Sequence, residues 1–318
     1  MAGKLIECVP NFSEGRRQVV IEAIVAPFRG KRGCALLDYR ADPNHNRLVV
    51  SLAGEPGPIQ AALLEASRVA IDSIDLEQHR GSHPRIGTVD VIPFTPLRNI
   101  SMEECVELSR EFGRRYYRET GVPVYFYEES ALRPERKRLE AIRKGQYEAL
   151  KTEVVEAKRH PDVGEPRLHP TAGATVIGAR QCLVAFNVNL GTRDLDVAKS
   201  IARAVRASSG GFCHVKGIGV FLEDRGLTQV SMNIVDFEKN PLYRVTELIR
   251  TEAKRWGIPV VETEVHGLIP LKAVLDSLSY YLQLAGLDSN QVIELRLLDL
   301  LAVNSSTGES RKKRRADG

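Results

Sequence analysis

Short apolar runs alternate along the chain with segments in which apolar residues recur at helical spacing. Val20, Ile21, Ile24, Val25 and Phe28 have that spacing and predict a helix over residues 17–28. By the same criteria the first half of the chain predicts strands over 5–10, 34–39, 47–54, 89–92 and 122–127, and helices over 17–28, 58–74 and 101–117. Their order is β-α-β-β-α-β-α-β.

Local signals support some of these boundaries. Ser101 and Glu104 have the capping-box spacing, in which each side chain satisfies an amide at the start of a helix. Gly121 is expected to end that helix. Pro123 cannot donate to a ladder, so the strand over 122–127 is expected at or near a sheet edge.

The middle of the chain is more polar. Residues 131–157 are rich in arginine, lysine and glutamate and predict a partly exposed helix. Residues 160–175 hold three prolines and two glycines, which predicts a loop. Such a loop is either a plain linker at a domain boundary or a segment that binds something.

The pattern then restarts. It predicts strands over 182–189, 215–223, 229–236 and 260–268, and helices over 195–207, 241–256, 271–284 and 291–302. Both halves thus predict an α+β class with two ferredoxin-like α/β subdomains, each a mostly antiparallel or mixed sheet covered by helices. The expected domains are 1–178 and 179–303, followed by a disordered basic tail over 304–318.

Composition narrows the class of protein. The chain has 318 residues, 43% hydrophobic and 27% charged, with a formal net charge of +4 that residues 311–315 alone more than supply. The rest is nearly neutral, so no nucleic-acid partner is expected. No apolar run approaches a bilayer span, and no signal peptide opens the chain, so we expect a cytoplasmic protein without a membrane partner. Widely spaced cysteines at 8, 34, 105, 182 and 213 are expected to be reduced thiols.

A histidine in a glycine- and proline-rich turn is the leading catalytic candidate. His83 precedes Pro84, which favours extended backbone before it, and Gly81 and Gly87 tolerate unusual backbone geometry. Imidazole titrates near neutrality, as a proton shuttle requires. The alternative is a surface histidine bonded to a neighbouring carbonyl. His79 has zinc-ligand spacing from His83 only on a helix, which Gly81 and Pro84 disfavour, so no metal is expected.

Motifs for nucleotide binding and serine hydrolysis are absent from the sequence. Polar residues instead interrupt apolar strands or follow them, and they face either water or a cavity. Their presence in both halves favours a cleft between two sheets. The members carried forward as site candidates are Asn11, Asp38, Arg47, His83, Arg85, Asp90, Asn187, Asn189, Lys216 and Gln229.

Several motifs occur in the order found in one family. They are Val-Pro-Asn-Phe-Ser-Glu-Gly over 9–15, His-Pro-Arg over 83–85 with Val-Asp-Val-Ile-Pro-Phe over 89–94, the segment 173–180 leading into Phe-Asn-Val-Asn-Leu over 186–190, Lys-Gly-Ile-Gly over 216–219, Gln-Val-Ser-Met-Asn over 229–233 and Gly-Leu-Ile-Pro-Leu-Lys over 267–272. Over residues 4–285 the chain resembles the glutamate formiminotransferase family.

The resemblance implies transfer of the formimino group from N-formimino-L-glutamate to N5 of tetrahydrofolate, with release of glutamate, in histidine degradation. It implies a homodimer whose two subdomains flank a folate groove, and it places the catalytic histidine on His83. The folate-contacting loop falls on Gly164, Glu165, Pro166, Arg167, Leu168, His169, Pro170, Thr171, Ala172 and Gly173. Bifunctional members continue into a cyclodeaminase domain, which a chain ending at 318 is expected to lack.

The remaining candidates receive roles as hypotheses. Asp38 or Asp90 orients the imidazole, and Arg47, Arg85 or Lys216 holds anionic groups of the substrates. Two alternatives stay open: formyl transfer between 5-formyltetrahydrofolate and glutamate, and a non-catalytic folate-binding protein. Assays with both donors distinguish the first alternative, and tight folate binding without turnover would support the second.

Overall fold

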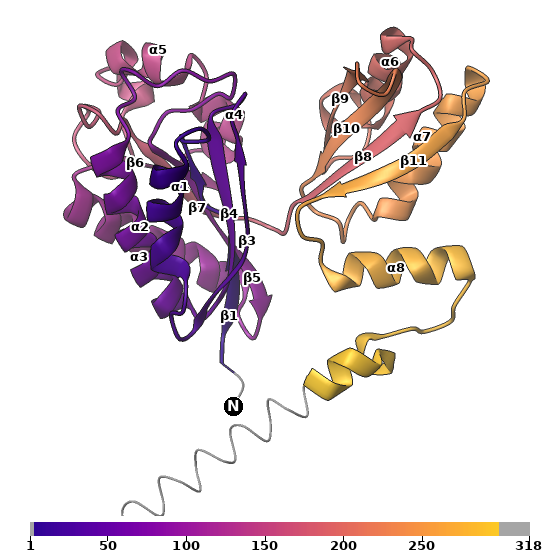
Figure 1. The fold of residues 1–318 in the computed structure, drawn as a ribbon, viewed down its shortest axis with the longest axis horizontal. Helices are drawn as coiled ribbons and strands as arrows, with labels where there is room; N and C mark the ends of the chain where they lie inside the picture. Colours follow the sequence, from indigo (N-terminus) through magenta and orange to yellow (C-terminus); the bar gives the residue numbers. More distant parts are fainter. Residues whose placement is uncertain (1–2, 299–318) are drawn as a thin grey trace, which may run out of the picture. The chain divides into compact units, whose positions relative to one another are not determined.

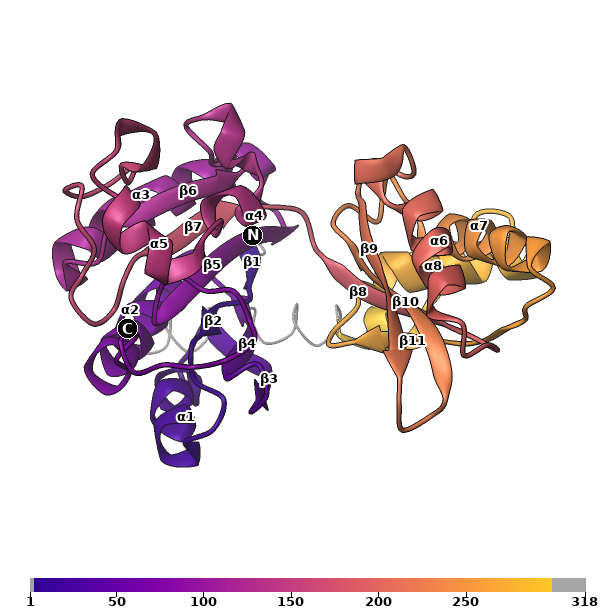
Figure 2. The same cartoon turned by 90° about the horizontal axis from the view of Figure 1, so that it is seen from above.

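The computed structural model describes residues 3–298, and the chain divides after Gln181 into two compact units (Figure 1). Unit 1 precedes that point and unit 2 follows it. Each unit is a β-sheet with helices packed on it, which confirms the predicted α+β class with two helix-covered sheets (Figures 1 and 2). Among the described helices, none combines the length and the apolar content that a bilayer crossing requires.

Unit 1 contains a mixed sheet in the order β1-β4-β2-β5-β7-β6, with β3 paired to the outer side of β4. Its strands are β1 (Leu5–Cys8), β2 (Asn11–Phe12), β3 (Cys34–Asp42), β4 (Arg47–Gly54), β5 (Val89–Arg98), β6 (Val124–Glu128) and β7 (Thr175–Ala179). Pro10 lies between β1 and β2, which pair with the same two neighbours and act as one interrupted strand. The antiparallel part therefore has the ferredoxin-like order, and β7 and β6 extend it in parallel.

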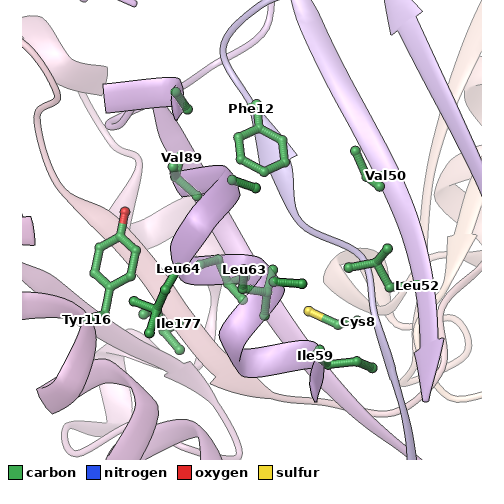
Figure 3. Close-up of a cluster of buried hydrophobic side chains, with 14 of the residues drawn as sticks. Cys8, Phe12, Val50, Leu52, Ile59, Leu63, Leu64, Val89, Tyr116 and Ile177 are labelled. Carbon is green, nitrogen blue, oxygen red and sulfur yellow. The ribbon is translucent and has the colours of Figure 1, made fainter. Parts of the chain in front are cut away.

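One face of this sheet carries the main core of unit 1. It packs against α1 (Gln18–Val25), α2 (Pro56–Ser73), α3 (Met102–Thr120) and the short 3₁₀ turn η1 (Ala26–Phe28). Figure 3 shows Phe12 and Leu52 of the sheet on the side where Leu63 of α2 lies. The predicted capping box at Ser101 is present, and Gly121 ends α3 with a left-handed conformation. Strand β6 is at the sheet edge, as Pro123 indicated.

The opposite face is covered near β5, β6 and β7 by residues 134–159, which we call the crossover segment. It comprises η2 (Pro134–Lys137), α4 (Leu139–Ile142), α5 (Gln146–Glu153) and η3 (Ala157–Arg159). The prediction of one helix over 131–157 is therefore wrong. Pro134 opens a 3₁₀ turn, and Gly145 and Gln146 both have positive φ values, 77° and 57°, which break the helical path.

Unit 2 is a four-stranded antiparallel sheet in the order β11-β8-β10-β9, the ferredoxin-like order. Its strands are β8 (Val184–Leu190), β9 (Val215–Leu222), β10 (Leu227–Ile234) and β11 (Val260–His266), and its helices are α6 (Leu195–Val205), α7 (Leu242–Arg255) and α8 (Leu271–Leu282), with the 3₁₀ turns η4 (Ala207–Ser209) and η5 (Ser289–Gln291). Val188 and Val230 point to the helical core.

Some local predictions need correction. Strand β7 begins at Thr175, the last residue of the expected loop, and continues to Ala179, where no strand was expected; its pairing with β5 and β6 places it in the sheet. The loop over 160–175 belongs to unit 1, since Val163 pairs with Val124 of β6. The last predicted helix is helical from 293 to 298, and its remainder, like the tail over 304–318, lies outside the described residues. All five cysteines are free thiols, with Cys213 exposed.

Candidate functional site

The turn around His83 is fixed by close backbone contacts. A Cβ atom on Gly81 would lie 2.3 Å from the carbonyl oxygen of His45, and one on Gly87 would lie 2.0 Å from that of Ala174. Neither glycine has a positive φ value. The two glycines are therefore needed for close approach and not for unusual backbone angles, which corrects the reason given by the sequence.

We expect replacement of Gly87 by alanine to destabilise the protein by about 1–3 kcal/mol, because the new methyl group forces β7 and the turn apart. Urea unfolding followed by circular dichroism measures this change. Gly57→Ala in α2 is the control, since a Cβ there has no neighbour within 4 Å. Equal stability of Gly87→Ala and the wild type would contradict the close approach of Gly87 to Ala174.

The His83 imidazole contacts a guanidinium. Nη1 of Arg47, at the start of β4, donates to Nε2 of His83. Since a guanidinium only donates, Nε2 carries the lone pair and the ring proton lies on Nδ1. Burial, followed by the charges of Arg47 and Arg143, lowers the pKa of His83 from 6.5 to about 3. The imidazole is therefore neutral at physiological pH, as a general base must be.

Arg143 of the crossover segment acts on this histidine through its positive charge. It caps the end of α4, and its Nη2 pairs with Oδ2 of Asp90. The other Asp90 oxygen, Oδ1, accepts a hydrogen bond of 2.8 Å from the amide of Ile86 in the His83 turn. Only 13% of the Arg143 side chain and 3% of the Asp90 side chain are exposed. Asp90 thus connects Arg143 to the turn.

Arg143 was missed by sequence reasoning. It lies 60 residues after His83 in the arginine-rich segment, where many side chains have the same character. Asp90 had been expected to orient the imidazole, but none of the described hydrogen bonds joins it to His83. Its influence is exerted through Ile86 and Arg143.

Other predicted residues have partners of their own. Asp38 lies within β3 and pairs with Arg40 at 2.9 Å, and Asn11 donates to the carbonyl of Val9 at 2.9 Å. Arg85 is buried, where it pairs with Glu148 at 2.8 Å and donates to Nδ1 of His79 at 3.0 Å. No described hydrogen bond joins Asp38, Asn11 or Arg85 to the His83 ring.

The loop over 164–173 borders a cavity of about 380 Å³ in unit 1. The end of α3 supplies one wall and the loop the other; the lining residues are Tyr117, Thr120, Gly121, Glu165, Arg167, Leu168, His169 and Pro170. Gly164 and Gly173 have positive φ values, 105° and 70°, and a Cβ on Gly173 would lie 2.2 Å from the carbonyl of Ile86. One end of the loop is therefore fixed against the His83 turn.

In unit 2 the predicted amides form a network on the sheet face opposite the helices. Asn189 donates to Glu262 at 2.8 Å and to Glu264 at 2.6 Å, and its oxygen accepts from Gln229 at 2.8 Å. Asn187 on the same strand accepts from the amide of Met232 at 3.2 Å. The three predicted amide residues, Asn187, Asn189 and Gln229, are buried. A ligand can therefore hydrogen-bond to these amide side chains only if it replaces some of the hydrogen bonds that they already make.

Charged neighbours of this network were not predicted. Glu262 and Glu264 alternate on β11, and Arg225 pairs with both of them, at 3.0 Å to Glu264. The alternation Val-Glu-Thr-Glu-Val over 261–265 could have indicated this. Lys216 lies on β9, opposite Asn233 of β10. Within residues 3–298, no cluster of three or more His, Cys, Asp or Glu residues suits a metal ion.

Comparison with known proteins matches both units. The N-terminal subdomain of the formiminotransferase domain matches residues 5–180, and the formiminotransferase domain matches residues 185–307. The chain belongs to the formiminotransferase family. The boundary between the two matches coincides with the division of the structure after Gln181.

Members of the formiminotransferase family include close relatives. Glutamate formimidoyltransferase from Streptococcus pyogenes serotype M1 is 48% identical over 296 residues, which cover 93% of this chain and 99% of the relative. Glutamate formimidoyltransferase from Thermoplasma acidophilum is 44% identical over 92% of this chain and 97% of the relative. Formimidoyltransferase-cyclodeaminase from Mus musculus is 45% identical over 87% of this chain but only 52% of the relative.

Proposed function

We propose that this protein is a glutamate formimidoyltransferase, which moves the formimino group from N-formimino-L-glutamate to N5 of tetrahydrofolate. The observation that carries the proposal is the neutral imidazole of His83, which bonds Arg47 and whose pKa is also lowered by the charge of Arg143. The near full-length match to relatives of that name supports it.

In the proposed reaction, N5 attacks the amidine carbon and Nε2 of His83 accepts the N5 proton. The tetrahedral intermediate then breaks its bond to the glutamate nitrogen, and the imidazolium returns the proton to that nitrogen as glutamate leaves. One imidazole serves as base and then as acid. The formimino carbon ends on N5, and the reaction as written is balanced without an oxidant or a metal.

Tetrahydrofolate is the proposed co-substrate. The loop over 164–173 is its proposed contact in unit 1, supported by the cavity of about 380 Å³, a size within the range of small-molecule sites. Asn187, Asn189 and Gln229 are the proposed contacts in unit 2, with Lys216 as a partner for folate carboxylates. Alanine at Leu168 or Gln229 should then raise the KM for tetrahydrofolate.

We also propose a cytoplasmic homodimer. Helix α8 supports a second copy as partner, because Val274, Leu278 and Tyr281 expose between 41% and 46% of their surface. Light scattering coupled to gel filtration of the full chain measures the mass. A monomer at micromolar concentration would contradict this part of the proposal.

A steady-state assay with two donors tests the reaction class. Turnover should require formiminoglutamate and tetrahydrofolate, and 5-formyltetrahydrofolate with glutamate should give a kcat/KM at least tenfold lower. A higher kcat/KM for the formyl donor would favour the alternative reaction. Tight folate binding without turnover of either donor would identify a binding protein.

The lowered pKa of His83 predicts the pH dependence of the free enzyme. A base is active when neutral, and a pKa of about 3 keeps this imidazole neutral well below the ordinary value of 6.5. We therefore expect that kcat/KM, which reports the free enzyme, shows no decrease from His83 titration between about pH 8 and about pH 5. Titration of the substrates themselves is measured separately. An enzyme-dependent decrease centred near 6.5 would contradict this environment.

A further inference from the structure

Arg47 has a half-buried positive charge without a directly paired carboxylate. Among residues 3–298, no carboxylate forms an ion pair with Arg47, and its described hydrogen bond goes to His83. Burial lowers the pKa of this guanidinium from its ordinary value. A guanidinium that is largely removed from water is usually paired with an anion, because desolvation of an unpaired charge costs free energy. Arg47 therefore has the chemistry expected of a residue that binds an anionic ligand.

Arg143 adds a second charge next to the same ring. Its Nη2 is paired with Asp90, but its buried Nε has no hydrogen-bond partner among the described residues. The other groups that act on the site are His45, whose ring centroid lies 6.1 Å from that of His83, and Asp42, which is already paired with His45. Asp90 pairs directly with Arg143, and Asp90 and Asp42 act on Arg47 only through their charges, so neither carboxylate bonds the Arg47 guanidinium.

We infer that Arg47 and Arg143 form a carboxylate subsite, and that a bound substrate carboxylate draws Arg47 away from Nε2 of His83. The inference deepens the proposed function and rests on it. In the free protein the lone pair needed for catalysis is occupied by Arg47. The Nε2 lone pair is therefore free to accept a proton only when the substrate carboxylate is bound.

The bound anion also changes the acidity of the ring. It offsets the charges of Arg47 and Arg143, which contribute to the low pKa of His83, so the pKa rises toward neutrality. A general base works best when its pKa lies near the working pH. The α-carboxylate of formiminoglutamate is the expected ligand, because it is attached to the carbon that bears the leaving nitrogen.

Nitrogen-15 NMR of histidine-labelled full-length protein tests the inference without turnover. The pKa of His83 is measured alone and with saturating glutamate, the reaction product. We expect a rise of at least about one unit, a tenfold change in the protonation equilibrium. A His83 pKa that changes neither with bound glutamate nor with bound 5-formyltetrahydrofolate would overturn the subsite.

Two variants of Arg143 test its charge and the planar geometry of its guanidinium. Arg143→Gln removes the charge, and Arg143→Lys keeps the pairing with Asp90 but loses the planar fork. Both should weaken glutamate binding, measured by calorimetry, by at least about tenfold. Arg68→Gln, an exposed arginine of α2 paired with Glu119, is the matched control and should bind normally. Wild-type affinity in both Arg143 variants would overturn the inference.

The folate tail also carries carboxylates, so separate additions distinguish the source. A rise with 5-formyltetrahydrofolate, but not with 5-formyltetrahydropteroate or glutamate, would keep the subsite and assign it to the folate tail. No rise with any of them would overturn it. Turnover of formiminoglutamate together with that last result would leave the proposed function standing and remove only the subsite.

Discussion

Replacement of His83 by alanine is expected to lower kcat by about 10²- to 10⁴-fold, the usual contribution of a positioned acid or base. The His83 imidazole is neutral, and its Nε2 faces the Arg47 guanidinium. Since the same ring both accepts and returns the proton, its loss affects both halves of the reaction. Steady-state kinetics with formiminoglutamate and tetrahydrofolate measures the change.

The fold should survive this replacement. The His83 side chain bonds Arg47 and the backbone of Pro84, and the ring is only partly buried. His160→Ala is a control from the same unit, where the ring bonds the carbonyl of Val155 at 3.1 Å. Near wild-type activity in a normally folded His83→Ala protein would remove His83 from the mechanism.

Replacement of Asp162 by alanine is expected to destabilise the protein by about 3–5 kcal/mol, the range for breaking a buried ion pair on one side. Asp162 pairs with Arg136 at 2.6 Å, and only 3% and 5% of these side chains are exposed. Asp162 also accepts a bond of 2.8 Å from the amide of Phe126 in β6. Its loss leaves the Arg136 charge buried and the amide unpaired.

Urea unfolding measures this loss, with Glu156→Ala as control. Glu156 forms an exposed pair with Lys158, whose removal should change stability by no more than about 1 kcal/mol. Because the crossover segment carries Arg143, Asp162→Ala should also reduce activity under conditions where the protein remains folded. Equal stability of the two variants would contradict the anchoring role of Asp162.

Much of the fold could be predicted from local patterns. The β-α-β-β-α-β order of each unit follows from apolar periodicity, and the capping box at Ser101 is encoded within four residues. The crossover segment could not be predicted in this way, because its sparse apolar residues fit a helix as well as the broken path that Gly145 and Gln146 produce. Strand β7 is placed by its parallel partners, which are distant in sequence.

The candidate site, like the fold, could be predicted from the sequence only where the signal is local. His83 was detectable because proline and glycine mark its turn within a few residues. Arg143 was not, because its role depends on how the crossover segment lies on β5 and on its pairing with Asp90. Asp38 and Arg85 were reasonable candidates by residue type, yet Arg40 and Glu148 are their partners in the structure.

The proposed reaction transfers one carbon from formiminoglutamate to folate. Carbon-13 NMR with the label on the formimino carbon follows that atom directly. With enzyme and tetrahydrofolate present, we expect the label to move to N5 with one equivalent of glutamate released, and we expect neither event when tetrahydrofolate is omitted. Label that stays on the donor, or that appears in free formamide while folate remains unlabelled, would contradict the proposed reaction.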